Sequence, residues 1–181
     1  MGGVDRVEFD KSSFELRQRG RKFEDFSLGQ TFEHHWGRTL GVADNTTFCA
    51  ATCNWNPIYL NKEFAIANGH PECPINPALV VCVVIGLTVE DLSETAGPFL
   101  GMDDCVFERP VYPGDTFTAR SSVISCRESE SRPGAGIVTW QTICVNQRNE
   151  TVVSFVRSNL VEKSPVRQAS TPAVVTAKAS D

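Results

Sequence analysis

Residues 76–94, NPALVVCVVIGLTVEDLSE, decide the fold. The stretch is apolar almost all round for several turns and becomes amphipathic towards its end. A helix that is apolar on every side is usually a buried one, although a valine-rich run also permits a buried strand. The length, the Asn-Pro opening and the VEDLSE ending favour the helix. We therefore expect a buried helix between about Pro77 and Ser93.

The segments on either side of this helix predict a sheet that wraps around it. Four strand patterns follow the helix, separated by the turn signals YPGD, RPGAG and NQRNE; they cover residues 99–110, 115–129, 135–148 and 151–163. Before it come one strand pattern and two short helices, at residues 31–40, 41–53 and 61–69. Asp44 lies near the start of the first short helix, and Asn61 and Gly69 are the expected cap and stop of the second. The predicted class is α+β, an antiparallel sheet around a central buried helix.

The chain of 181 residues has room for one domain with a substantial core. Residues 23–163 carry the patterned segments. We expect residues 1–22 to form a loosely attached polar arm. The tail, residues 164–181, is built from Ala, Ser, Thr, Pro and Val without periodicity, and we expect it to be disordered.

Composition and charge exclude several function classes. With a net charge of −5 we expect no basic patch on the surface, which argues against a nucleic-acid partner. No apolar run is long enough to span a bilayer, and the charged N-terminus lacks a signal-peptide core. The seven cysteines form an odd set without a CxxC pair, so we expect reduced thiols and a cytoplasmic location. Neither the histidines nor the cysteines have metal-ligand spacing, and no metal or other cofactor is expected.

The turn CNWNPIYLN, residues 53–61, together with four other motifs, carries a family resemblance. NWNPIYLNKEFA resembles the Gly-Asp-x-Asn-Pro-(aliphatic)-His turn and following helix of the MaoC-like hydratase/dehydratase family. FEDFSLGQTF and RPVYPGDTF resemble that family's entry to the first strand and its later Gly-Asp turn. GLTVEDLSE and ESRPGAGIVTWQTICVNQRNE resemble the branch around mesaconyl-CoA hydratase (β-methylmalyl-CoA dehydratase). The resemblance covers roughly residues 23–163.

The resemblance implies a hot-dog fold, a homodimer, and hydration or dehydration at the 2,3 double bond of an acyl-CoA thioester. A carrier-protein thioester is the alternative substrate. The family's catalytic Asp falls on Asn54 and its catalytic His on Tyr59, so both acid–base groups differ here. Asn56 and Pro57 match the motif's polar and turn positions.

Hydration needs a base for water, an acid for the α-carbon and donors for the enolate oxygen. Tyr59, with an ordinary pKa near 10, suits the acid and not the base. Asn54 can orient a water, and we expect it to converge with Tyr59 on one pocket. The start of the buried helix, at Asn76, Pro77 and Ala78, can supply N–H donors to the enolate oxygen. We expect Asn56 to contact substrate as well.

His70, in the loop NGHPE, is the histidine nearest the motif and a candidate catalytic or ligand-contacting group. His34 and His35 are adjacent in a strand and must face opposite sides, so we expect structural roles for both. The asparagines of the turn could equally serve turn hydrogen bonds, and Tyr59 could be a packed aromatic. Three hypotheses therefore stay open: a variant hydratase or dehydratase, a related lyase or isomerase acting on an activated acyl thioester, and a catalytically silent thioester- or partner-binding protein.

Overall fold

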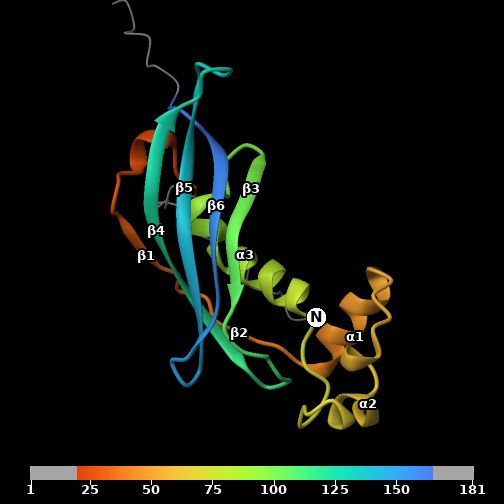
Figure 1. Cartoon of the computed structure of the whole chain (residues 1–181). Coiled ribbons are helices and arrows are strands. Elements are labelled where there is room, and N and C mark those ends of the chain that lie inside the picture. Colours follow the sequence, from red (N-terminus) through yellow and green to blue (C-terminus); the bar gives the residue numbers. More distant parts are fainter. Residues whose placement is uncertain (1–19, 165–181) are drawn as a thin grey trace, which may run out of the picture.

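The structure is a computed structural model that describes residues 20–164. Of the expected arm (1–22) and tail (164–181), all but residues 20–22 and Ser164 lie outside the described residues. Within the described part, the chain forms an antiparallel sheet with one long helix, α3, across one of its faces (Figure 1). The predicted α+β architecture is confirmed.

Helix α3 runs from Pro77 to Leu92, one residue short of the predicted end. Asn76 caps it, because its Oδ1 accepts a hydrogen bond of 2.9 Å from the Ala78 N–H, and Pro77 occupies the first helical position, which needs no N–H donor. The apolar face buries Leu79, Val80, Val83, Val84, Leu87 and Leu92. The sequence predicted a helix buried on every side, and in the single chain this is true of one face only. In the single chain a narrow stripe of smaller residues is exposed: Ala78, Cys82, Gly86 and Val89.

The sheet has the strand order β1–β4–β5–β6–β3, with β2 also paired to β4. Its strands are β1 (Thr31–Glu33), β2 (Arg38–Thr39), β3 (Phe99–Phe107), β4 (Thr116–Glu128), β5 (Ala135–Asn146) and β6 (Thr151–Glu162). All pairings are antiparallel. The four strands predicted after the helix are thus confirmed to within a few residues at each end, and β3 forms one edge of the sheet.

The strand predicted at residues 31–40 is two short strands, with His34 to Gly37 outside both, although the His34 N–H still donates to Ala119 O of β4 at 3.0 Å. The expectation that the two histidines face opposite sides is confirmed: His34 is buried and His35 exposed. His34 Nδ1 lies 2.7 Å from Asp91 Oδ2 and its Nε2 lies 2.9 Å from Ser121 Oγ. Burial lowers the pKa of His34 despite the Asp91 carboxylate. His34 therefore links β1, β4 and α3 as a neutral, structural histidine.

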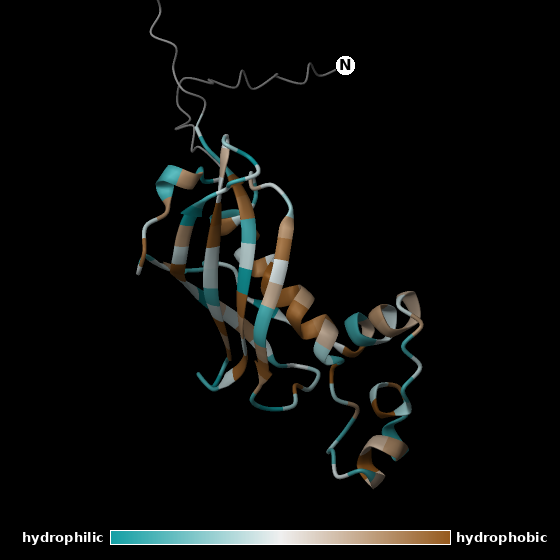
Figure 2. Cartoon of the chain, turned by 45° about the horizontal axis from the view of Figure 1, so that its top comes forward, coloured by the Kyte–Doolittle hydropathy of each residue, from teal (hydrophilic) through white to brown (hydrophobic). Residues whose placement is uncertain are grey.

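Two apolar clusters fill the space between α3 and the sheet. The larger joins the first half of α3 to β4, β5 and β6, and the smaller surrounds Trp140 and Leu92. Phe26 packs edge-on against Trp140, with ring centroids 5.4 Å apart. Figure 2 shows the apolar residues concentrated on α3 and along the strands, and polar ones on the connecting loops. This core holds α3 in place, and with it the start of the helix at Pro77.

A small helical lobe lies beyond the N-terminal end of α3, away from the sheet (Figure 1). It consists of α1 (Val42–Ala51), the short 3₁₀ helix η3 (Pro57–Tyr59) and α2 (Lys62–Ala67). Asp44 Oδ2 accepts the Gly41 N–H at 2.8 Å, and Asn61 Oδ1 accepts the Phe64 N–H at 3.1 Å, as expected of caps at the starts of α1 and α2. Among the described helices, none combines the length and apolarity needed to cross a membrane.

Candidate active site

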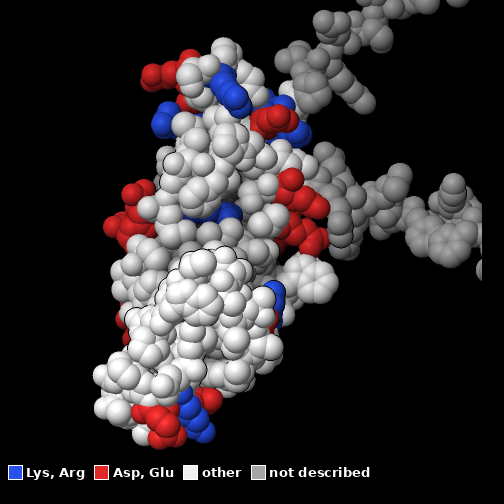
Figure 3. Space-filling view, turned by 90° about the vertical axis from the view of Figure 1, so that its right-hand side faces the viewer, with Lys and Arg blue, Asp and Glu red and all other residues white. Residues whose placement is uncertain are grey.

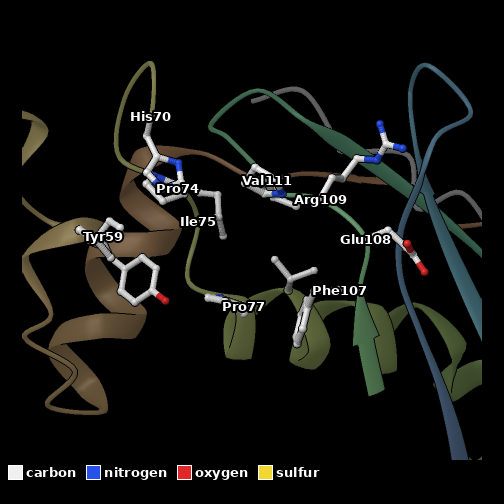
Figure 4. Close-up of a pocket in the computed structure, with 12 residues that line it drawn as sticks. Tyr59, His70, Pro74, Ile75, Pro77, Phe107, Glu108, Arg109 and Val111 are labelled. Carbon is white, nitrogen blue, oxygen red and sulfur yellow. The ribbon is translucent and has the colours of Figure 1, made fainter. Parts of the chain in front are cut away.

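A pocket of about 340 Å³ opens between the helical lobe, the start of α3 and the end of β3 (Figure 4). Its walls are apolar apart from a tyrosine, a histidine and the adjacent charged residues Glu108 and Arg109. The lining residues are Ile58, Tyr59, His70, Pro74, Ile75, Pro77, Val80, Phe107, Glu108, Arg109, Pro110 and Val111.

Tyr59 enters the pocket from the last position of η3. Asn56 begins this 3₁₀ helix, because its Oδ1 accepts the Ile58 N–H at 3.1 Å, and Pro57 fixes the first turn. The Tyr59 hydroxyl is directed towards the start of α3 (Figure 4). Burial raises the pKa of Tyr59, and the neighbouring Cys49 adds to the effect. The phenol therefore stays protonated at neutral pH and has a proton that it can donate.

His70 lines the same end of the pocket as Tyr59 (Figure 4), in the loop that follows α2. Gly69 precedes it with a φ of +88°, a conformation that glycine adopts without strain and that ends the helix. His70 Nδ1 is 2.9 Å from the hydroxyl of Tyr112, and which of the two groups donates depends on the histidine tautomer. Tyr112 is held in turn by Asp115, whose Oδ2 accepts the Tyr112 N–H at 3.1 Å. The Gly-Asp turn of the sequence thus orients His70.

The start of α3 has fewer free N–H groups than the sequence suggests. Pro77 has none, and the Ala78 N–H donates to Asn76 Oδ1. The Asn76 N–H donates to Asn45 Oδ1 at 2.8 Å. Pro77 lines the pocket, so the positive end of the helix dipole faces it. Negative charge that develops at this place is stabilised by the dipole.

The two asparagines of the turn are placed differently from Tyr59. Neither Asn54 nor Asn56 is among the residues that line the pocket. The Asn54 N–H donates to Cys49 O at 2.9 Å just after Cys53, whose φ of +54° turns the chain out of α1. Asn56 is exposed and caps η3. The structure therefore brings Tyr59, His70 and Pro77 together, and leaves Asn54 and Asn56 outside this group.

Three residues near the pocket had no functional role in the sequence reasoning. Glu108 and Arg109 line it, but their side chains are directed away from Tyr59 (Figure 4). Arg109 Nη1 pairs with Glu150 Oε1 at 2.7 Å, which anchors the wall to the turn between β5 and β6. Asn45, buried in α1, holds backbone groups of the wall. In the sequence, the fragment ERPVYPGD pointed to the region of Glu108 and Arg109, whereas the fragment ADNTTF gave no sign of a role for Asn45.

The pocket offers a protonated phenol, an imidazole, a helix N-terminus and apolar walls. Among residues 20–164 there is no group of His, Cys, Asp and Glu side chains that could hold a metal ion. Acid, base and dipole around an apolar cavity suit proton transfer to and from a carbon next to a carbonyl.

Comparisons with known proteins agree with this chemistry. Residues 6–179 match the family model described as mesaconyl-CoA hydratase. A mesaconyl-CoA hydratase of Haloarcula hispanica is 37% identical over 150 residues, which are 82% of this chain and 42% of the relative. The chain thus spans about two fifths of the length of that relative.

Solved structures show the same fold. A putative MaoC domain protein dehydratase from Chloroflexus aurantiacus matches with a TM-score of 0.76 and 34% identity over 89% of this chain and 45% of that one. A conserved hypothetical protein from Mycobacterium tuberculosis, described as a double hotdog fold, matches with a TM-score of 0.75 and 24% identity over 90% of this chain and 53% of that one. The expected hot-dog fold and the MaoC-like resemblance are confirmed, and the chain belongs to the mesaconyl-CoA hydratase family.

Proposed function

We propose that this protein adds water to, or removes it from, the 2,3 double bond of an enoyl-CoA thioester in the pocket beside Tyr59. The observation that carries the proposal is the hydroxyl of Tyr59, directed at the start of α3 in an apolar cavity that also holds His70; burial there raises the pKa of Tyr59. The names of the matched relatives support the reaction class, since one is a mesaconyl-CoA hydratase and another a β-methylmalyl-CoA dehydratase.

In the proposed hydration, His70 accepts a proton from water while the water oxygen bonds to C3. The electron pair of the double bond moves towards the thioester oxygen, where the N-terminal end of α3 stabilises the developing charge. Tyr59 then donates its proton to C2, and exchange with solvent returns both groups to their starting states. Dehydration is the reverse.

The assignment of acid and base follows from the environment of each group. Desolvation opposes the charged tyrosinate, so Tyr59 cannot serve as the base near neutral pH. His70 is the imidazole in the pocket, and its Nδ1 is fixed by Tyr112, which leaves Nε2 for water. Asn54 lies outside the residues that line the pocket, so the proposal gives it no part in the proton transfers.

The test is turnover of crotonyl-CoA and mesaconyl-CoA, followed by loss of the enoyl absorbance. We expect the wild-type protein to hydrate at least one of them. Tyr59→Phe and His70→Gln should each abolish most of the activity while leaving the fold intact. Retention of full activity in both variants would place the chemistry elsewhere.

A catalytically silent thioester-binding protein is the second candidate. The observation in its favour is the replacement of the family Asp and His by Asn54 and Tyr59, which leaves a pocket without a carboxylate directed at its centre. Tight binding of coenzyme A thioesters without turnover, unchanged by Tyr59→Phe, would establish it. The cytoplasmic location stays a prediction from the cysteines.

We also propose that a second copy of this chain covers β3 and the exposed stripe of α3. The face towards β3 and the helical lobe carries few charged residues, which gather at its rim (Figure 3). Phe99, Leu100, Val106 and Phe107 of β3 are large apolar residues that are nearly half exposed at this open sheet edge. Pairing of two such edges would bury them. Sedimentation should show a homodimer at micromolar concentration; a stable monomer would contradict the proposal.

A further inference from the structure

Asn45 is a buried amide in the second turn of α1, with 3% of its surface exposed. Its Nδ2 donates to the carbonyl oxygen of Tyr59 at 3.0 Å and to that of Pro74 at 3.2 Å. Its Oδ1 accepts the Asn76 N–H at 2.8 Å and lies 4.0 Å from Cys49 Sγ. One side chain therefore contacts the backbone of η3, of the loop after His70 and of the residue that caps α3.

These contacts use the full capacity of the amide. An asparagine side chain has two N–H donors and one oxygen with two acceptor sites, and all of them have partners here. The three backbone partners belong to two segments that are separate in the sequence, η3 and the residues before α3, and Tyr59 and Pro74 line the pocket. Asn76 also donates from Nδ2 to Cys49 Sγ at 3.7 Å, which closes the cluster behind the wall.

We propose that Asn45 is the positioning residue that sets Tyr59 against the start of α3. The inference rests on the proposed function, because the distance between the Tyr59 hydroxyl and the enolate site matters for the proton transfer proposed there. Asn45 does not line the pocket and touches no reacting atom, so it acts through the backbone of Tyr59, Pro74 and Asn76.

Position matters here because proton transfer to carbon requires a short, aligned approach, and a displacement of about 1 Å can cost on the order of 100-fold in rate. The helical lobe stands beyond the end of the sheet and shares little core with it (Figure 1). Buried hydrogen bonds to backbone groups are therefore the means by which α1 fixes Tyr59 relative to α3.

The test compares Asn45→Asp, Asn45→Ala and a matched control, Asn68→Asp. Asn68 is also a helix amide, whose Nδ2 donates to Phe64 O at 2.8 Å, but it is exposed and lies outside the pocket wall. Near neutral pH we expect both Asn45 variants to lower kcat about 10- to 100-fold with little change in KM. Asn68→Asp should keep wild-type kinetics.

The pH profile separates positioning from general loss of structure. In its ionised form the carboxyl group of Asn45→Asp cannot donate to the Tyr59 and Pro74 carbonyls; once protonated, it donates one hydrogen bond again. The kcat of Asn45→Asp should therefore rise, relative to wild type, as the pH falls through the pKa of the new carboxyl group. Asn45→Ala has no such recovery. The charged side chains facing Asn45 across a neighbouring cavity are Lys62 and Glu72, and both are present in all variants.

A second readout does not depend on turnover. In a Tyr112→Phe background Tyr59 is the one tyrosine left, so its ionisation can be followed by tyrosinate absorbance. The carboxylate of Asn45→Asp should move this titration to higher pH than Asn45→Ala does. If wild-type protein hydrates no thioester, the proposed function fails, and this titration still shows whether position 45 is coupled to the Tyr59 hydroxyl. Coinciding titrations of the two variants, or equal pH profiles of their kcat, would overturn the inference.

Discussion

Replacement of Tyr59 by phenylalanine removes one oxygen atom from the pocket and keeps the ring. In the described part of the chain the Tyr59 hydroxyl makes no hydrogen bond to another residue, so its removal leaves no buried partner unsatisfied. The melting temperature of Tyr59→Phe should therefore stay close to that of wild type. A change in rate can then be read as a change in chemistry.

The expected loss follows from the role assigned to the phenol. A positioned general acid contributes about 10²- to 10⁴-fold, which corresponds to roughly 2.7 to 5.5 kcal/mol of transition-state stabilisation. Because the proton is transferred in the transition state, kcat should fall and KM should change little. Because burial raises the pKa of Tyr59, wild-type kcat should also stay level up to about pH 10 before it declines.

The assay is the hydration rate of the best thioester substrate from neutral to alkaline pH, for wild type and Tyr59→Phe. Tyrosinate absorbance should show both tyrosines ionising above pH 10, since burial raises the pKa of Tyr59 and of Tyr112. Two outcomes would refute the reasoning: Tyr59→Phe retaining kcat within about threefold of wild type, or an alkaline decline that survives the substitution unchanged.

Three further predictions concern the stability of the fold. The Asn146 amide and the Arg148 and Arg109 guanidinium groups hold the pKa of Glu150 at about 2. The stability that these contacts give is therefore complete above about pH 4.5 and is lost as the pH falls towards 2. Glu150→Gln should make the melting temperature depend less on pH over this acid range. Gly136→Ala should destabilise the protein by about 1 to 3 kcal/mol in urea unfolding, because the added methyl group meets the Phe23 ring, whereas Gly134→Ala, with open space around it, should not. Arg157 is 1% exposed and its guanidinium lies 5.4 Å from the centroid of the Trp140 ring, but its Nε and Nη2 have no hydrogen-bond partner among the described residues and burial lowers its pKa to about 10. Arg157→Met should therefore leave stability unchanged or raise it by about 1 to 4 kcal/mol; a loss of stability greater than that of the exposed Arg120→Met would contradict this account.

The fold was predictable because its signals are local. The apolar run of α3, the Asn-Pro cap and the alternating strands are periodic patterns whose physical cause lies within a few residues. The strand at residues 31–40 was the exception. The strand pattern is interrupted after the buried His34, whose side chain contacts Asp91 and Ser121, partners that are distant in the sequence.

The site was predictable in part. The Asn-Pro turn located Tyr59, and loop position located His70, because both follow local turn chemistry. Asn54 was expected beside Tyr59, yet Cys53 turns the chain in a left-handed conformation that spacing along the sequence does not reveal. Asn45 was missed because an asparagine inside a helix gives no sign that its amide reaches two carbonyls 14 and 29 residues away.

The hydrogen bond between His70 and Tyr112 links the pocket to the turn behind it. If the Tyr112 hydroxyl donates to Nδ1, the proton of neutral His70 resides on Nε2 and the imidazole cannot accept one from water. If Nδ1 donates to Tyr112, Nε2 carries the lone pair and His70 can be the base. The raised pKa of Tyr112 keeps its hydroxyl a neutral group that is able to accept as well as donate. The proposed reaction requires the second tautomer. The acid–base assignment of this site thus depends on one hydrogen-bond direction, set at the Gly-Asp turn and outside the motif that carries Tyr59.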